Sequence, residues 1–343
     1  MKLSIIVPVY NMAADDKLTY CLDSLIAQTI DDYEIIAVDD CSTDDSYMIM
    51  QEYEKRYPDK FRAIHSEVNL HQGGAKNIGI KAAKGDWIGF IDADDWIVPD
   101  YYERMIGKAE ETGADIVGCD YTIVHGHTYE IGEIDTNGRA DQVGVLDHDK
   151  KRSLILDSGS LCVKIFKRKT ILDNELWFPE HIFYEDNALG NSYMLTGTHF
   201  EYIQEPLYYY YQHGDSTVHS FSVKRCEDRM EAGRLMIAEA KRLGFYEEFK
   251  DELEYKFTQL FYVNTLFTYM PCVRPTKVGF VKAMTAELLS FFPDFKENEY
   301  YRERTPKEEK RLIDMACDSA LKFYVYYKLL WAYRNMRKKV SRR

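Results

Sequence analysis

A short apolar run that stops abruptly in carboxylates is the feature of this sequence that most limits its fold. Residues 87–91 are aromatic or β-branched apart from Gly89, which is typical of a buried strand. Asp92, Asp94 and Asp95 follow within four residues. Because an unpaired buried carboxylate is costly, these side chains must lie where the strand leaves the sheet, in water or beside a cation.

The carboxylate cluster has two interpretations. Carboxylate oxygens suit Mg²⁺ or Mn²⁺, and Mg²⁺ commonly takes one or two carboxylates and completes its shell with water and substrate phosphates. The alternative is an acidic turn that caps a helix, because Pro99 and a helical pattern come next. Taken alone, the stretch does not decide between them.

Strand patterns and helical patterns alternate in the first part of the chain. Three more apolar runs predict strands, at residues 3–9, 33–38 and 61–65. A glycine-containing loop at 69–79 opens a helix. The alternation predicts an α/β fold with a doubly wound, mainly parallel sheet. Because ligands bind beyond the carboxyl ends of such strands, Asp39 and Asp40 should line one crevice with the cluster at 92–95.

The later part of the chain changes character. Strands are expected at 114–119, in a hairpin at 121–134, and at 200–203 and 206–212. Tyr208–Tyr211 are expected on a half-buried edge strand, with exposed rings that could stack on a sugar. Long helices are predicted at 221–243, 246–269, 275–291 and 307–338. We therefore expect two domains, a catalytic domain at 1–218 and a helical region with a basic tail at 219–343.

Charge and cysteine content exclude several classes of protein. The formal net charge of −13 argues against broad nucleic-acid binding. Residues 321–343 carry eight basic and no acidic residues, which leaves −21 on residues 1–320. The seven cysteines form no C-x-x-C pair, the N-terminus shows no signal peptide, and no apolar stretch is long enough to span a membrane. These features predict a cytoplasmic protein.

Six segments lie in a familiar order, at residues 4–11, 24–29, 38–44, 74–77, 90–95 and 184–186. Together they resemble the family 2 glycosyltransferases, which have the GT-A fold and transfer the sugar with inversion. The resemblance does not extend to the helical part after about residue 220. It implies an α/β catalytic domain that binds a nucleotide sugar.

The resemblance assigns donor-binding residues. Pro8, Val9 and Tyr10 would make backbone and stacking contacts with the nucleotide, and Asp39 or Asp40 would hydrogen-bond the base. A carboxylate can accept from the N–H of uracil. The alternative is that Asp39 and Asp40 only cap the next helix.

The resemblance also places a metal site and a base. Asp92-Ala93-Asp94 stands where the family keeps its D-x-D motif for Mg²⁺ or Mn²⁺, and we favour Asp94 as the direct ligand over Asp92 or Asp95. Lys76 replaces the usual arginine, either as a phosphate contact or as a surface lysine. Glu185 and Asp186 match the acidic pair that supplies the catalytic base, and Asp186 is preferred.

His213 and Cys162 are less informative. His213 lies where some family members contact the diphosphate or the metal, and the alternative is an exposed histidine in a glycine turn. Cys162 stands where the family usually has a large aromatic residue, and it is given no role.

These features predict an inverting, metal-dependent glycosyltransferase. It would move a sugar from a nucleotide-diphosphate donor, preferably a UDP-sugar, to a hydroxyl of a lipid-linked or growing surface glycan such as a capsule, exopolysaccharide, O-antigen or teichoic acid. One alternative is a nucleotidyltransferase, which would need a glycine-rich, basic loop where residues 8–11 stand. Another is a non-catalytic protein that binds a nucleotide or a glycan.

The tail predicts contact with a membrane. An apolar stripe at helical spacing runs through Leu312, Ala316, Ala320, Phe323, Tyr327 and Leu330. Interfacial rings and eight basic residues lie beside it. We expect residues 321–343 to hold the protein on the inner face of the plasma membrane. The alternative is that the stripe packs on the rest of the protein.

Overall fold

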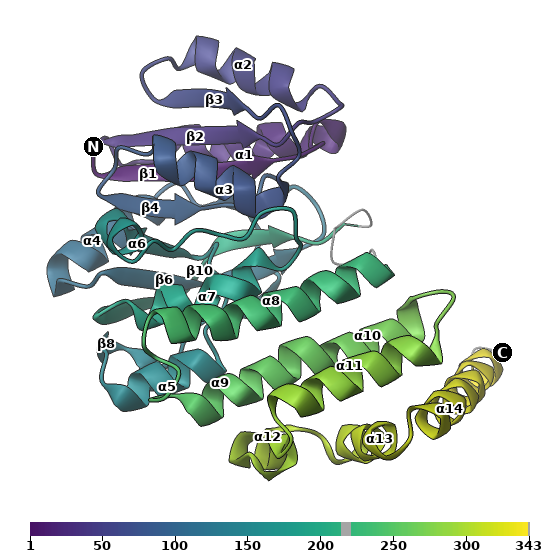
Figure 1. The fold of residues 1–343 in the computed structure, drawn as a ribbon. Helices are drawn as coiled ribbons and strands as arrows, with labels where there is room; N and C mark the ends of the chain where they lie inside the picture. Colours follow the sequence, from purple (N-terminus) through teal and green to yellow (C-terminus); the bar gives the residue numbers. More distant parts are fainter. Residues whose placement is uncertain (214–220, 342–343) are drawn as a thin grey trace. The chain divides into compact units, whose positions relative to one another are not determined.

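The computed structural model describes residues 1–213 and 221–341 (Figure 1). The chain divides into two compact units, Met1–Ser216 and Thr217–Arg343. The first is built on a sheet and the second on helices.

A mixed sheet forms the centre of the first unit (Figure 1). Its order is β3-β2-β1-β4-β9-β6-β10-β5, with β7 paired to β6 and β8 paired to β10. The strands are β1 (Leu3–Val9), β2 (Tyr33–Asp39), β3 (Phe61–His65), β4 (Trp87–Phe90), β5 (Trp96–Ile97), β6 (Ile116–Val124), β7 (Glu133–Asp135), β8 (Gly144–Val145), β9 (Lys164–Lys167) and β10 (His199–Tyr211). The predicted α/β sheet is confirmed, with parallel pairing among β1, β2, β3 and β4.

The two strands expected at 200–203 and 206–212 are one strand, β10. Its register against β6 shifts on either side of Pro206, because proline has no N–H to give to the ladder. The expectation of an edge strand is wrong. Strand β10 pairs with β6 on one side and β5 on the other, and Tyr208 and Tyr209 are buried.

Helices cover both faces of the sheet. Alternate residues of β1, from Leu3 to Val9, pack in one core with α1, α2 and α4. Ile6 points to the other face, where Gly79 of α3 lies against it, and Phe90 meets Tyr193 of α7 there. The helices of this unit are α1 (Lys17–Ile26), α2 (Ser46–Arg56), α3 (His71–Ala82), α4 (Tyr101–Thr112), α5 (His148–Leu156), α6 (Arg168–Asp173) and α7 (Glu185–Leu195).

The second unit is helical, as predicted, but two expected helices are divided. Its helices are α8 (Val223–Arg242), α9 (Lys250–Phe257), α10 (Asn264–Cys272), α11 (Val278–Phe291), α12 (Glu299–Arg304), α13 (Lys307–Asp318) and α14 (Ala320–Ser341). A π-helical turn at Thr258–Val263 lies between α9 and α10. The helix expected at 307–338 breaks at Ser319, where the backbone is extended and the Ser319 hydroxyl accepts from the Lys322 N–H (3.3 Å).

The apolar stripe predicted to meet a membrane is largely buried in this unit. Leu312, Ala316, Phe323 and Tyr327 all belong to its core, because α13 and α14 turn these side chains toward the bundle. The packing alternative therefore holds for the buried members of the stripe. Within residues 1–213 and 221–341, no helix combines the length and apolar character that crossing a bilayer requires.

Candidate active site

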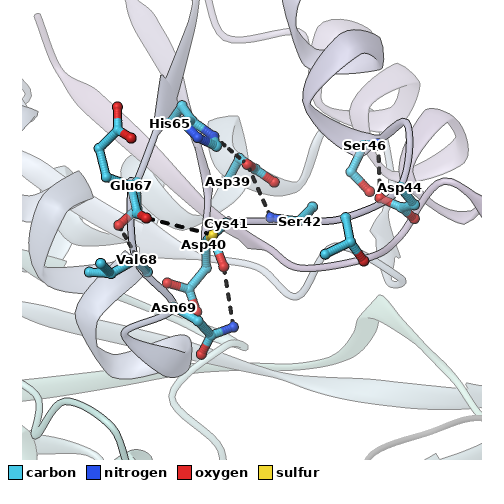
Figure 2. A network of polar contacts seen from close by, with 12 residues as sticks. Asp39, Asp40, Cys41, Ser42, Asp44, Ser46, His65, Glu67, Val68 and Asn69 are labelled. Atoms are coloured by element: carbon cyan, nitrogen blue, oxygen red, sulfur yellow. Dashed lines mark hydrogen bonds and ion pairs between the residues drawn. The ribbon is translucent and has the colours of Figure 1, made fainter.

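The carboxyl ends of β1, β2 and β3 meet at one edge of the sheet. The parallel register pairs Val9 with Asp39 and Asp39 with His65. Asp39 is buried; its Oδ2 lies 2.7 Å from His65 Nδ1 and accepts from the Ser42 N–H at 3.3 Å (Figure 2). Its other oxygen, Oδ1, is buried and has no hydrogen-bond partner among the described residues. A buried acceptor of this kind is suited to a ligand donor.

Asp40 joins this edge to the start of α3. Its N–H donates to Val9 O (2.8 Å), and its Oδ1 accepts from the Leu70 N–H (2.7 Å). Burial raises the pKa of Asp40 to about 6, although the N–H groups of Leu70 and His71 act in the opposite direction.

Neither carboxylate caps the helix that follows. The Ser46 N–H at the start of α2 donates to Asp44 Oδ1 (3.0 Å; Figure 2). The predicted alternative, in which Asp39 or Asp40 caps that helix, is therefore wrong.

Pro8, Val9 and Tyr10 lie at the same edge. Pro8 and Val9 are buried in β1, so they can contact a ligand only through their backbone groups at the end of the strand. Tyr10 is 46% exposed and has a ring free to stack on a planar group.

The three carboxylates after β4 have different environments. Asp95 is buried, and both of its oxygens accept from β10, Oδ2 from the Tyr208 hydroxyl (2.5 Å) and Oδ1 from the Tyr211 N–H (2.9 Å). Burial and the charges of Asp94 and Asp92 raise the pKa of Asp95 well above its ordinary value. Asp95 thus holds the loop to the sheet.

Asp92 and Asp94 lie nearer the surface. Asp92 accepts from Gln72 Nε2 (2.5 Å) and from Cys162 Sγ (3.4 Å). Asp94 Oδ2 lies 2.9 Å from His213 Nε2, with side-chain exposures of 19% and 11%. The expectation of an exposed turn histidine at 213 is wrong, because this contact draws the ring against Asp94.

The fit to a divalent cation rests on this pair. Within the described residues, no group of three or more His, Cys, Asp or Glu side chains is arranged to hold a metal. One or two protein ligands are enough for a cation completed by water and phosphate oxygens. Asp94 and His213 fit that role, and the buried His213 Nδ1 has no partner among the described residues.

Lys76 and Glu185 form a buried ion pair between α3 and α7. Lys76 Nζ lies 2.8 Å from Glu185 Oε1, with side-chain exposures of 2% and 5%. Burial opposes the charge on Lys76, but the nearby carboxylates, Glu185 first, raise its pKa above the ordinary value. Burial raises the pKa of Glu185, and Lys76 offsets part of that effect. Lys76 is not the surface lysine offered as an alternative.

Asp186 is the more accessible member of the acidic pair. It is partly exposed, whereas Glu185 is buried. Asp186 Oδ1 accepts from the N–H of Asn187 (2.8 Å), in the first turn of α7.

The sequence did not reveal how the segment before α7 is held. Asn77 of α3 accepts from the Phe178 N–H (2.9 Å) and donates to Phe178 O (2.8 Å). A Cβ on Gly73 would lie 2.1 Å from Pro179 O, so only glycine allows this approach. The spacing of Gly73, Lys76 and Asn77 along one helix face was the available signal.

The sequence model described as "Glycosyl transferase family 2" matches residues 4–192, more than half of the chain. The chain belongs to glycosyl transferase family 2. This confirms the predicted family and the glycosyltransferase activity, and it removes the nucleotidyltransferase and non-catalytic alternatives. Members of the family with this fold generally use a divalent metal.

Relatives support the same assignment for this family 2 glycosyltransferase. EpsH of Bacillus subtilis (strain 168), named as a glycosyltransferase, is 33% identical over 264 residues, 74% of this chain and 73% of EpsH. YibD of Escherichia coli (strain K12) is 32% identical over 219 residues, 63% and 62% of the two chains. Poly(ribitol-phosphate) beta-glucosyltransferase of Bacillus spizizenii is 35% identical over 190 residues, 53% of this chain but only 27% of that protein.

Solved structures confirm the GT-A fold of this family 2 enzyme. Staphylococcus aureus TarS residues 1–349, in complex with UDP, aligns with a TM-score of 0.64 at 20% identity over 92% of this chain and 91% of that chain. The same part of TarS with UDP-GlcNAc gives 0.61 at 20% identity over 98% and 92%. A Pyrobaculum calidifontis mannosyltransferase with GDP-Man and Mn²⁺ gives 0.50 at 13% over 97% and 87%.

Proposed function

We propose that this enzyme is an inverting, metal-dependent glycosyltransferase that uses a UDP-sugar donor. The buried Asp39 Oδ1, without a partner among the described residues at the end of β2, carries the proposal. An ionised carboxylate accepts from the uracil N–H. Asp40 fixes the neighbouring loop, and Tyr10 can stack on the base. The UDP and UDP-GlcNAc complexes of TarS support this choice of nucleotide.

Two further carboxylates, Asp94 and Asp186, would carry the chemistry. Asp94 would hold Mg²⁺ or Mn²⁺ together with His213, with Asp92 beside them. A cation bound there would supply positive charge for the departing diphosphate. Asp186 takes the proton of the acceptor hydroxyl as its oxygen attacks the anomeric carbon. Lys76 and Glu185 keep the first turn of α7 in place for that transfer. The domain division at 1–218 and 219–343 would assign these steps to the first domain.

The acceptor is a hydroxyl of a lipid-linked or growing surface glycan at the cytoplasmic face of the membrane. The named activity of the Bacillus spizizenii relative, on poly(ribitol phosphate), supports an acceptor of this class. Capsule, exopolysaccharide, O-antigen and teichoic acid all present such hydroxyls.

The test is nucleotide release from a panel of UDP-, GDP- and dTDP-sugars, with Mn²⁺ or Mg²⁺ and with chelator. We expect UDP release only from UDP-sugars and only with metal. Turnover of another nucleotide alone would refute the donor assignment, and full activity in chelator would refute metal dependence.

A further inference from the structure

Helix α14 has an apolar face that its own unit does not bury. The outer row of α14 consists of five side chains that are 49–66% exposed, namely Leu321, Val325, Leu329, Tyr333 and Met336. Steps of four, four, four and three residues place them on one side of the helix. Large exposed apolar patches of this kind mark interaction sites.

The opposite face of α14 is already occupied. Phe323 and Tyr327 are buried in the bundle. The Tyr324 hydroxyl donates to Thr276 O (2.8 Å), and Arg334 pairs with Glu308. Because these contacts fix the helix by one side, the outer row is left facing away from the bundle.

The surroundings of the outer row are basic. Lys322 lies within the angular span of the row, and Lys328 borders it. Neither lysine forms an ion pair with another residue that the structure describes, and Lys328 Nζ lies 5.4 Å from the centre of the Tyr324 ring. Residues 321–343 contain eight basic and no acidic residues. The partner of this face must therefore be apolar and negatively charged.

We propose that the outer row of α14 lies on an anionic phospholipid surface, as a helix in the plane of the interface. This inference rests on the proposed function and gives the enzyme its route to a lipid-linked acceptor. The residues proposed to contact the lipid are those of the outer row, and not those of the buried stripe predicted from the sequence. A second copy of the chain at this face would bring Lys322 and Lys328 close to the same lysines of the other copy, whereas anionic headgroups neutralise them. Tyr333 would lie at the headgroup level, where tyrosine is enriched.

Charge predicts the size of the effect. Each basic residue close to an anionic leaflet strengthens partition by about fivefold. Replacing both Lys322 and Lys328 by glutamate should thus weaken binding by roughly 25-fold or more. Since the Debye length falls from about 10 Å at 0.1 M salt to about 3 Å at 1 M, salt should release the protein.

The experiment is sedimentation of the full chain with vesicles of phosphatidylglycerol and phosphatidylcholine, and with phosphatidylcholine alone. The wild type should pellet with the anionic vesicles only. The double variant Val325→Glu/Leu329→Glu should stay in the supernatant. The matched control is Val145→Glu on β8, because Val145 is 69% exposed and lies outside α14; it should pellet like wild type. Circular dichroism checks that each variant is folded.

Three results would overturn the proposal. They are a wild type that stays in solution, a folded Val325→Glu/Leu329→Glu variant that pellets fully, and self-association of the wild type that this variant abolishes while vesicle binding is absent. Nucleotide release without vesicles is measured in parallel. A wild type that releases no nucleotide would count against the proposed function. A wild type that releases nucleotide but does not pellet would count against this surface alone.

Discussion

Lys76 Nζ lies 2.8 Å from Glu185 Oε1, and both side chains are almost completely removed from solvent. The two residues come from α3 and from the first turn of α7, and they are separated by 109 positions in the chain. The ion pair ties the segment that carries Asp186 to the helix beside β1. Lys76 is therefore a buried residue that positions the first turn of α7, and not a surface lysine.

Removing the ammonium group of Lys76 should leave the buried carboxylate of Glu185 uncompensated. We expect Lys76→Met to lower the free energy of unfolding by about 3–5 kcal/mol, measured by urea denaturation. The double variant Lys76→Met/Glu185→Leu should recover most of that loss, because replacing a whole buried pair by apolar side chains is often neutral. A single variant as stable as wild type would contradict the pairing.

Replacing Asp186 or Glu185 by the corresponding amide should affect different properties of the enzyme, the transfer rate for Asp186 and the stability for Glu185. Asp186→Asn should lower the transfer rate by about 10²- to 10⁴-fold, the usual contribution of a general base, with little change in donor affinity. Glu185→Gln should mainly lower stability, because its carboxylate is committed to Lys76. Initial rates and donor titrations separate the two. Reduced donor affinity at unchanged turnover in Asp186→Asn would assign that residue to binding.

Asp94 should be needed for metal binding, whereas Asp95 should be needed for the stability of the loop after β4. An amide is a poor substitute for an anionic ligand, so Asp94→Asn should nearly abolish transfer and Mn²⁺ binding by calorimetry while the melting temperature stays close to wild type. Asp95→Asn should lower the melting temperature, since its oxygens accept from Tyr208 and Tyr211. Wild-type transfer by Asp94→Asn, with or without chelator, would exclude Asp94 as the ligand.

Asp40 should make nucleotide binding depend on pH. Burial raises its pKa to about 6, so the carboxylate is ionised at pH 7.5 and becomes neutral as the pH falls through about 6. Its acceptor bond from the Leu70 N–H then weakens, and UDP affinity should decline over that interval. In Asp40→Asn the decline should be absent, because the amide does not titrate. Calorimetric UDP titrations from pH 5 to 8 measure both, and an equal decline in the variant would contradict this role.

The sequence was most informative where chemistry is local. Strand β1 was predicted with its bounds because a near-continuous apolar run of this length is typical of a strand buried on both faces. The carboxylates after β2 and β4 were expected at one edge because parallel strands end together. Ser319 could have been identified as the cap that divides the last predicted helix, since serine favours that position.

Long-range contacts were beyond reach. Nothing local to Lys76 indicates a carboxylate more than a hundred residues away, and nothing in 208–211 says that β5 will cover the outer side of β10. The His213–Asp94 contact likewise depends on the path of β10 through the sheet. These relationships arise from the order of strands, which periodicity does not specify.

The approach of α3 to the segment before α7 gives a prediction whose sign is unusual. Replacing glycine by alanine inside a helix ordinarily stabilises a protein by roughly 0.5–1 kcal/mol. At Gly73 the new Cβ would lie 2.1 Å from Pro179 O and 3.2 Å from Glu185 Cβ, so the backbone of that segment must move. We expect Gly73→Ala to destabilise the fold by about 1–3 kcal/mol.

Gly107 of α4 provides the matched control, because a Cβ there would meet nothing within 4 Å. Gly107→Ala should follow the ordinary rule, with higher stability and unchanged transfer. Gly73→Ala should also slow transfer with donor affinity retained, since Asp186 lies seven residues after Pro179 and moves with the displaced segment. Urea denaturation and initial rates on both variants make the comparison. If Gly73→Ala were stabilising, like Gly107→Ala, the close approach of α3 to this segment would be refuted.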